Sequence, residues 1–114
     1  MSKITTHVLD TSRGRPASGV PVVLEIQSGE HGWELIGKGE TDADGRVRDL
    51  LPQGHILTVG VYRLTFETNL YFASQKIEGF YPEVTIIFSV RDAAEHYHVP
   101  LLLNPYGYST YRGS

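Results

Sequence analysis

The chain has 114 residues and a formal net charge of −3, with 13 acidic and 10 basic residues that form no basic stripe suited to nucleic acid. Hydrophobic residues make up 40% of the sequence and charged residues 20%, as in ordinary globular proteins, so we expect one domain over residues 1–114. The lack of cysteine excludes disulfides, a thiolate nucleophile and a cysteine-ligated metal.

The first residues of the chain contain no apolar core of the kind found in signal peptides. No apolar run approaches the length that spans a membrane. We therefore expect a cytoplasmic protein whose partners include neither a membrane nor nucleic acid.

Alternation of apolar and polar residues predicts short strands along most of the chain. In chain order they are expected over residues 4–10, 20–27, 33–41, 46–48, 57–68 and 83–91, and in a final hairpin over 96–103 and 108–111. Gly37 and Gly39 predict a bulge or a twisted edge in the third strand. The alternation breaks over residues 69–75, where we expect one short helix capped by Thr68.

Seven or eight short strands separated by turn residues predict an all-β, two-sheet β-sandwich with one short helix. Successive side chains of a strand point to opposite faces of its sheet. His96 and His98 therefore share one face at the start of the final hairpin, and Thr5 and His7 share one face of the first strand.

The run His96-Tyr97-His98 has the spacing of two metal ligands on one strand, for which His7 or Glu95 could supply the third. Two other interpretations need no metal. The histidines could be hydrogen-bonded structural residues, or they could act as acid and base, since an imidazole titrates near neutrality, with a pKa of about 6.5. From the residues alone we rank the structural interpretation first, metal-free catalysis second and metal binding third.

The segment Asp42-Ala43-Asp44-Gly45 has the start of a calcium loop without its remaining ligands or its closing Glu, so we expect a tight turn. Taken alone, Arg46 and Arg112 would be solvated charges and His7 a surface residue. His31 and His55 lie in turn-rich stretches and are assigned no role.

Nearly the whole chain resembles the transthyretin-like family, and specifically its 5-hydroxyisourate hydrolase branch. Six segments carry the resemblance: Thr6-His7-Val8-Leu9-Asp10, Asp44-Gly45-Arg46, Gly60-Val61-Tyr62-Arg63, Phe80-Tyr81-Pro82-Glu83-Val84, and the two C-terminal runs from His96 to Leu103 and from Tyr108 to Ser114. The hormone-carrier branch shares the sandwich but lacks the His-Tyr-His run and the terminal Tyr-Arg-Gly-Ser. Asn104 stands where the family commonly has Ser.

The resemblance implies an eight-stranded sandwich that pairs into dimers and then into a homotetramer, a dimer of dimers, with the site in the channel between the dimers. It implies hydrolytic ring opening of 5-hydroxyisourate to 2-oxo-4-hydroxy-4-carboxy-5-ureidoimidazoline in urate degradation, without a metal or another cofactor. The residues that match the family's site are His7, Arg46, His98, Tyr111, Arg112, Gly113 and Ser114.

On this resemblance we expect His98 to activate water, with His7 beside it to share the proton. We expect Arg46 to hold substrate oxygens by a forked contact. Hydroxyls of Tyr111 and Ser114 would contact the edge of the substrate ring. Arg112 would bind the terminal carboxylate or a neighbouring chain, and His96 would support His98.

Two other classes of function stay open at this point. One is a non-catalytic carrier with an apolar ligand in the channel. The other is a metal-dependent hydrolase that uses His96 and His98.

Overall fold

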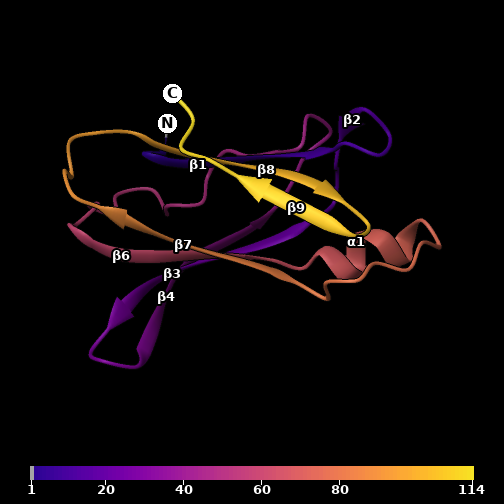
Figure 1. Cartoon of the computed structure of the whole chain (residues 1–114). Coiled ribbons are helices and arrows are strands. Elements are labelled where there is room, and N and C mark those ends of the chain that lie inside the picture. The colour runs from indigo at the N-terminus through magenta and orange to yellow at the C-terminus, as the bar shows by residue number, and fades with distance from the viewer. Residues whose placement is uncertain (1) are drawn as a thin grey trace.

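The computed structural model describes residues 2–114, so residue 1 of the expected domain lies outside the described residues. Two β-sheets pack face to face, with a short helix at one end (Figure 1). The first sheet has the order β2 (Arg15–Pro16), β1 (Ile4–Asp10), β8 (Tyr97–Asn104), β9 (Gly107–Thr110), and β5 (Arg46–Val47) also pairs with β1. The second has the order β4 (Gly32–Glu40), β3 (Pro21–Ser28), β6 (Gly60–Phe66), β7 (Val84–Val90).

The predicted two-sheet sandwich is therefore confirmed. The described residues form nine strands rather than seven or eight. β5 corresponds to the strand expected over residues 46–48, so the additional strand is β2, which is two residues long and too short to show an alternating pattern.

The core lies between the sheets, where the long strands place every second side chain. Each such apolar side chain contributes about 1.5–3 kcal/mol when fully buried. Alternation in the strands expected over residues 20–27, 57–68 and 83–91 predicts one inward row of apolar side chains in each, and these rows are buried or half-buried: Val20, Val22, Leu24 and Ile26; Tyr62, Leu64 and Phe66; Val84, Ile86, Phe88 and Val90. The alternation thus identified the core face of these strands correctly.

The second sheet departs most from the expected strand bounds at β6 (Gly60–Phe66), which was expected over residues 57–68. β6 begins at Gly60 rather than at residue 57, because the preceding loop is held by the Tyr62 hydroxyl, which donates to the Thr58 carbonyl at 2.7 Å. The expected bulge is present in β4. Leu24 pairs with Gly37 and the next residue of β3 pairs with Leu35, so Ile36 has no partner.

The helix α1 (Thr68–Ser74) forms where the alternation broke, but its predicted cap is wrong. Glu67 precedes the helix without a side-chain cap, and Thr68 is its first residue. The Thr68 hydroxyl is buried and donates to the Tyr81 carbonyl at 3.3 Å, so it fastens the helix to the following loop instead.

Strands β1 and β8 run parallel and side by side although they come from opposite ends of the chain (Figure 1). Their register places Thr5 opposite His98, a separation of 93 residues in sequence. On the other edge of β1, His7 lies opposite Arg46 of β5. The centre of the first sheet therefore unites three distant segments. Within residues 2–114, no helix is both long enough and apolar enough to cross a membrane.

Candidate active site

The outer face of the first sheet collects the polar side chains. Thr5 and His7 are half-buried on this face, because the residues between and beside them on β1 point into the core. His98 is half-buried on the same face of β8, between the buried Tyr97 and Val99. Thr5 lies opposite His98, and His7 lies two positions further along β1. At this diagonal spacing, long side chains on neighbouring strands can reach each other.

The turn before β5 brings Arg46 to this face. The carboxylate of Asp42 accepts the backbone N–H groups of Asp44 at 2.9 Å and of Arg46 at 3.0 Å. Gly45 has φ 77°, and its carbonyl accepts the N–H of Val8 at 2.8 Å, which locks the turn against β1. The segment is thus the tight turn expected from its sequence, and it sets Arg46 beside His7.

One hydroxyl joins two imidazoles at the start of β8. Oγ1 of Thr5 lies 2.8 Å from Nδ1 of His98 and 3.1 Å from Nε2 of His96. The two rings are nearly parallel, with centroids 6.5 Å apart and planes inclined by 17°. His96 is exposed and His98 is half-buried, so the hydroxyl connects an interior ring to one at the surface.

The pKa of His98 is lowered. Burial is the largest cause, since it penalises the charged ring, and the Arg46 cation is the next, followed by His96 and His7. A lowered pKa leaves the imidazole neutral at physiological pH, the form that can accept a proton from water.

The C-terminal segment lies across His98. Gly113 pairs with this residue and donates its N–H to the His98 carbonyl at 2.8 Å. A Cβ on Gly113 would come 2.6 Å from Cδ2 of the ring, so only glycine lets the backbone approach this closely. Ser114 follows at the border of the hollow that Arg46 and His98 line.

Arg112 lies against β8 and is bound to groups of this chain. Its Nη2 donates to the Glu95 carboxylate at 3.0 Å and to the His96 carbonyl at 3.4 Å, and its guanidinium stacks over the Tyr97 ring at 4.5 Å. Tyr111 is 58% exposed. Both residues border a separate hollow of about 250 Å³ on the β7 side, which His98 also reaches.

The hollow at the candidate site has a volume of about 390 Å³, enough for a small heterocycle. Its lining includes Thr5, Arg46, His96, His98 and Ser114. His7 is not part of this lining, although it lies next to it through its pairing with Arg46. The predicted residues His7, Arg46, His98 and Ser114 thus come together from four segments, while Tyr111 and Arg112 lie beyond His98.

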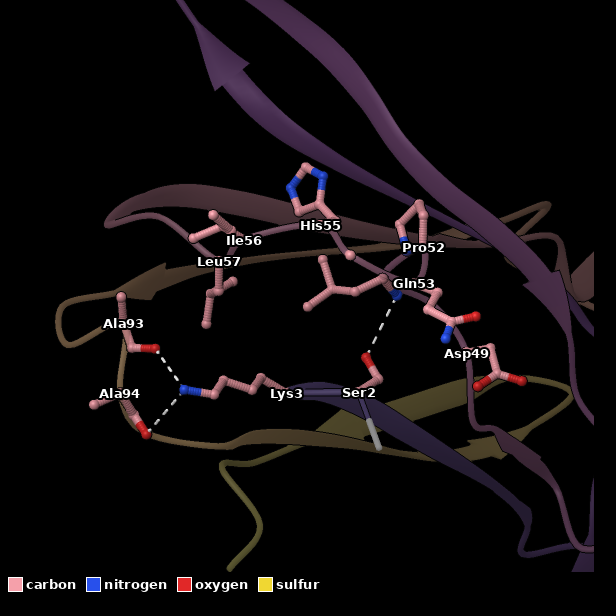
Figure 2. A pocket seen from close by; sticks show the side chains of 12 residues that line it. Ser2, Lys3, Asp49, Pro52, Gln53, His55, Ile56, Leu57, Ala93 and Ala94 are labelled. Atoms are coloured by element: carbon pink, nitrogen blue, oxygen red, sulfur yellow. Dashed lines mark hydrogen bonds between the residues drawn. The ribbon is translucent and has the colours of Figure 1, made fainter.

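A larger hollow of about 1040 Å³ lies between the N-terminal residues, the 51–57 loop and the β7–β8 loop. Figure 2 shows Lys3 reaching across it, where Nζ donates to the carbonyls of Ala93 at 3.1 Å and Ala94 at 3.4 Å. Its one histidine is His55, and neither a second imidazole nor an arginine belongs to its lining. Two imidazoles and two arginines border the smaller hollow, and Asp49 borders both.

No group of three or more His, Cys, Asp or Glu side chains within residues 2–114 is arranged to hold a metal ion. Glu95, considered from sequence as a third ligand, is paired with Arg112 instead. His96 and His98 direct one nitrogen each at the Thr5 hydroxyl. The arrangement suits proton transfer better than metal ligation.

Thr5 was missed as a site residue. The sequence showed that Thr5 and His7 share one face of a strand. The position of Thr5 opposite His98 depends on the parallel pairing of β1 with β8, for which the sequence carries no local signal.

Residues 4–113 match the model of the HIUase/Transthyretin family. The chain belongs to this family. It is 49% identical over 111 residues to a 5-hydroxyisourate hydrolase of Salmonella dublin, covering 97% of this chain and 80% of the relative. The structure of Klebsiella pneumoniae 5-hydroxyisourate hydrolase superposes with a TM-score of 0.83 at 37% identity, covering 97% of this chain and 98% of the other.

Sea bream transthyretin, solved in complex with thyroxine, superposes with a TM-score of 0.91 at 29% identity and covers 98% of this chain and 95% of its own. Within the family, backbone similarity therefore does not follow sequence identity. Since hydrolases and a protein solved with thyroxine share one fold, the two must be separated by site chemistry.

Proposed function

We propose that this chain is a 5-hydroxyisourate hydrolase, which opens the six-membered ring of its substrate to form 2-oxo-4-hydroxy-4-carboxy-5-ureidoimidazoline during urate degradation. The observation that carries the proposal is the half-buried His98, whose pKa is lowered, on one sheet face with Arg46 and His7. Identity near one half to curated hydrolases over nearly the whole chain supports it. A cytoplasmic location stays a prediction.

Opening a cyclic amide requires a base for water, a donor for the developing oxyanion and a proton for the leaving nitrogen. In our proposal the neutral His98 takes a proton from water, and His7 on the neighbouring strand shares or relays it. Arg46 binds the substrate oxygens through its forked N–H groups. The Ser114 hydroxyl meets the edge of the ring.

The proposed assembly is a homotetramer with the site between dimers. In one chain the outer face with His98 is open to solvent, and a second copy over this face would exclude water from the reaction. We place the proposed contacts of Tyr111 and Arg112 with substrate in this assembled state, because both lie beyond His98 in the isolated chain. The proposed reaction uses neither a metal nor another cofactor.

The proposal is tested with purified protein and freshly prepared 5-hydroxyisourate, by following the decay of substrate absorbance. The wild-type chain should accelerate the decay, and His98→Asn should remove most of the acceleration because the base is lost, about 10²-fold or more. Circular dichroism checks that the variant is folded. His31→Gln, in the turn after β3, is the matched control and should keep full activity.

Two further arms separate the alternatives. Activity that disappears on exhaustive chelation would favour the metal-dependent hydrolase. A wild-type chain that leaves the decay unchanged but binds thyroxine would favour the carrier, as the sea bream relative suggests.

A further inference from the structure

The Thr5 hydroxyl occupies an unusual position for a strand residue on an outer face. It lies within hydrogen-bond distance of one nitrogen of His98 and one nitrogen of His96. A hydroxyl carries one proton, so it donates to one ring and accepts from the other. The three groups therefore form a directed chain, and the direction is set by which ring carries the proton that faces Thr5.

Two directions are possible, and each fixes the state of His98. When Nδ1–H of His98 donates to Thr5, the hydroxyl donates to Nε2 of His96, and Nε2 of His98 is free to act as a base. When Nε2–H of His96 donates to Thr5, the hydroxyl donates to Nδ1 of His98, and Nε2 of His98 carries a proton. Reversal of the chain therefore converts the ring between the base form and the acid form.

We propose that Thr5 is a positioning residue that joins His98 to His96 in a proton relay from the active site to solvent. This inference rests on the proposed function. His98 Nε2 takes a proton from the attacking water as the O–H bond breaks. Nδ1 of His98 then releases its proton to Thr5 Oγ1, while the hydroxyl proton of Thr5 passes to Nε2 of His96. His96, which is exposed, loses the proton on its Nδ1 to solvent. When the carbon–nitrogen bond breaks, His98 Nε2 donates its proton to the leaving nitrogen and the relay runs back, with His96 taking a proton from solvent, so that all three groups return to their starting states.

The proton balance of the proposed reaction requires proton exchange between the site and solvent. Water brings two protons to the opened amide, and the leaving nitrogen keeps one of them. The new carboxyl group ionises at neutral pH, since carboxyl pKa values lie near about 4. One proton must therefore leave the site in each turnover, and the half-buried His98 has a pKa too low to retain it.

The charges around the relay favour outward movement. Arg46 and His7 face His98 from β5 and β1 and, together with His96, lower its pKa. At the other end, Arg112 donates to the His96 backbone carbonyl and pairs with the Glu95 carboxylate. The Arg46 cation thus lies at the inner end of the relay, whereas at the outer end the charge of Arg112 is paired with the Glu95 carboxylate.

Thr5→Val and Thr5→Ser form the matched pair that tests the relay. Both keep the strand, but only Ser keeps the hydroxyl. In dilute buffer without imidazole, we expect Thr5→Val to lower kcat about 10-fold to 100-fold with little change in KM, and Thr5→Ser to stay within about 3-fold of wild type. Added imidazole buffer should raise kcat of Thr5→Val toward wild type, because the buffer replaces the missing proton exit.

His96→Gln should show the same dependence on imidazole buffer, because it removes the solvent end of the relay. His31→Gln should show none. If Thr5→Val and Thr5→Ser lose activity equally, or if imidazole has no effect on Thr5→Val and His96→Gln, Thr5 and His96 have only a structural role and the relay is overturned.

Nitrogen-15 NMR of the histidine rings tests the hydrogen bonds without substrate. Wild type and Thr5→Ser should show one shared tautomer of His98, and Thr5→Val should change the Nδ1 signal and the tautomer ratio. An unchanged His98 spectrum in Thr5→Val overturns the relay even if the enzyme is active. The wild type could fail to hydrolyse 5-hydroxyisourate while the His98 spectrum still responds to Thr5→Val. That result would contradict the proposed function but support the hydrogen bond between Thr5 and His98.

Discussion

At the scale of single residues, the reactivity proposed for His98 depends on what surrounds it. Burial and the Arg46 cation both disfavour the charged ring, and the Thr5 hydroxyl orients it. The same imidazole on an open strand would be partly protonated near neutrality. The local environment thus prepares a base without any unusual residue type.

The pH dependence of the reaction should report this environment. The pKa of His98 lies below the usual value of about 6.5. Above pH 6.5 the ring is neutral, so kcat/KM should not change with its titration. Below the lowered pKa, kcat/KM should fall tenfold per pH unit because the base becomes protonated. Arg46→Gln removes a neighbouring cation and should move the midpoint to higher pH. An NMR titration of the His98 ring checks the same shift without turnover, and an unmoved midpoint would contradict the assigned cause.

Gly113 is a second residue whose effect is local. A methyl group at this position would meet the His98 ring, so Gly113→Ala should displace the ring or the terminal segment and lower kcat about 10-fold to 100-fold. Gly107→Ala, in β9, is the control, because a Cβ there meets only the Asn104 side chain at 3.8 Å. Steady-state kinetics measure both variants. Equal activities would contradict the need for glycine beside the His98 ring.

The candidate site was only partly predictable at this scale. His7, Arg46, His98 and Ser114 were expected from family resemblance, and the structure brings them together. Thr5 could not be singled out because a threonine in an alternating strand carries no chemical signal of its own. Its contribution arises from a partner 93 residues away.

At the scale of elements, the buried Asp10 connects the end of β1 to α1. Its carboxylate accepts the Ser12 hydroxyl at 2.6 Å, the Tyr71 hydroxyl at 2.7 Å and the backbone N–H groups of Ser12 and Arg13. Burial raises the pKa of Asp10, but these hydrogen bonds outweigh it, and the net pKa is lowered. The connection holds β1, and with it His7, in place.

The lowered pKa of Asp10 gives its contribution to stability a defined pH dependence. The stabilisation is fully present above the unfolded-state pKa of about 3.9 and is lost as the pH falls through the lower folded-state value. At pH 7, Asp10→Asn should reduce the free energy of unfolding by about 1–3 kcal/mol, because a charged acceptor of four hydrogen bonds is lost. Urea unfolding at pH 7 and at pH 3 measures both effects.

Tyr71→Phe is the matched control, since it removes one of these hydrogen bonds and keeps the carboxylate. Its loss should be smaller than that of Asp10→Asn at pH 7. A difference between Asp10→Asn and wild type that does not shrink at pH 3 would contradict the assigned charge state.

The elements themselves were mostly predictable, because alternation reports burial directly. The β6 boundary and the helix cap were not, since both depend on tertiary hydrogen bonds of Tyr62 and Thr68. The parallel pairing of β1 with β8 also lay beyond sequence, because alternation shows which face a residue takes and not which strand lies beside it.

At the scale of the whole molecule, each sheet has one protected edge and one unprotected edge. β4 carries a bulge and three charged residues, and β2 is two residues long with an Arg and a Pro, all features that discourage edge pairing. The opposite edges, β7 and β9, contain no charged residue. Both border the hollow that Tyr111 lines, so the unprotected edges lie on one side of the sandwich (Figure 1).

This asymmetry identifies the side on which the proposed tetramer should form its first dimer contact. Ile87 on β7 is 60% exposed, and Leu35 on β4 is 58% exposed, so one substitution can be compared at two edges of the same sheet. Ile87→Lys should lower the molar mass in solution from about four chains to two or fewer, because a buried lysine would oppose edge pairing, whereas Leu35→Lys should leave it unchanged. Light scattering after size exclusion measures both. If the Ile87 variant keeps the wild-type mass, or if the Leu35 variant dissociates instead, the first dimer contact does not use the β7 edge.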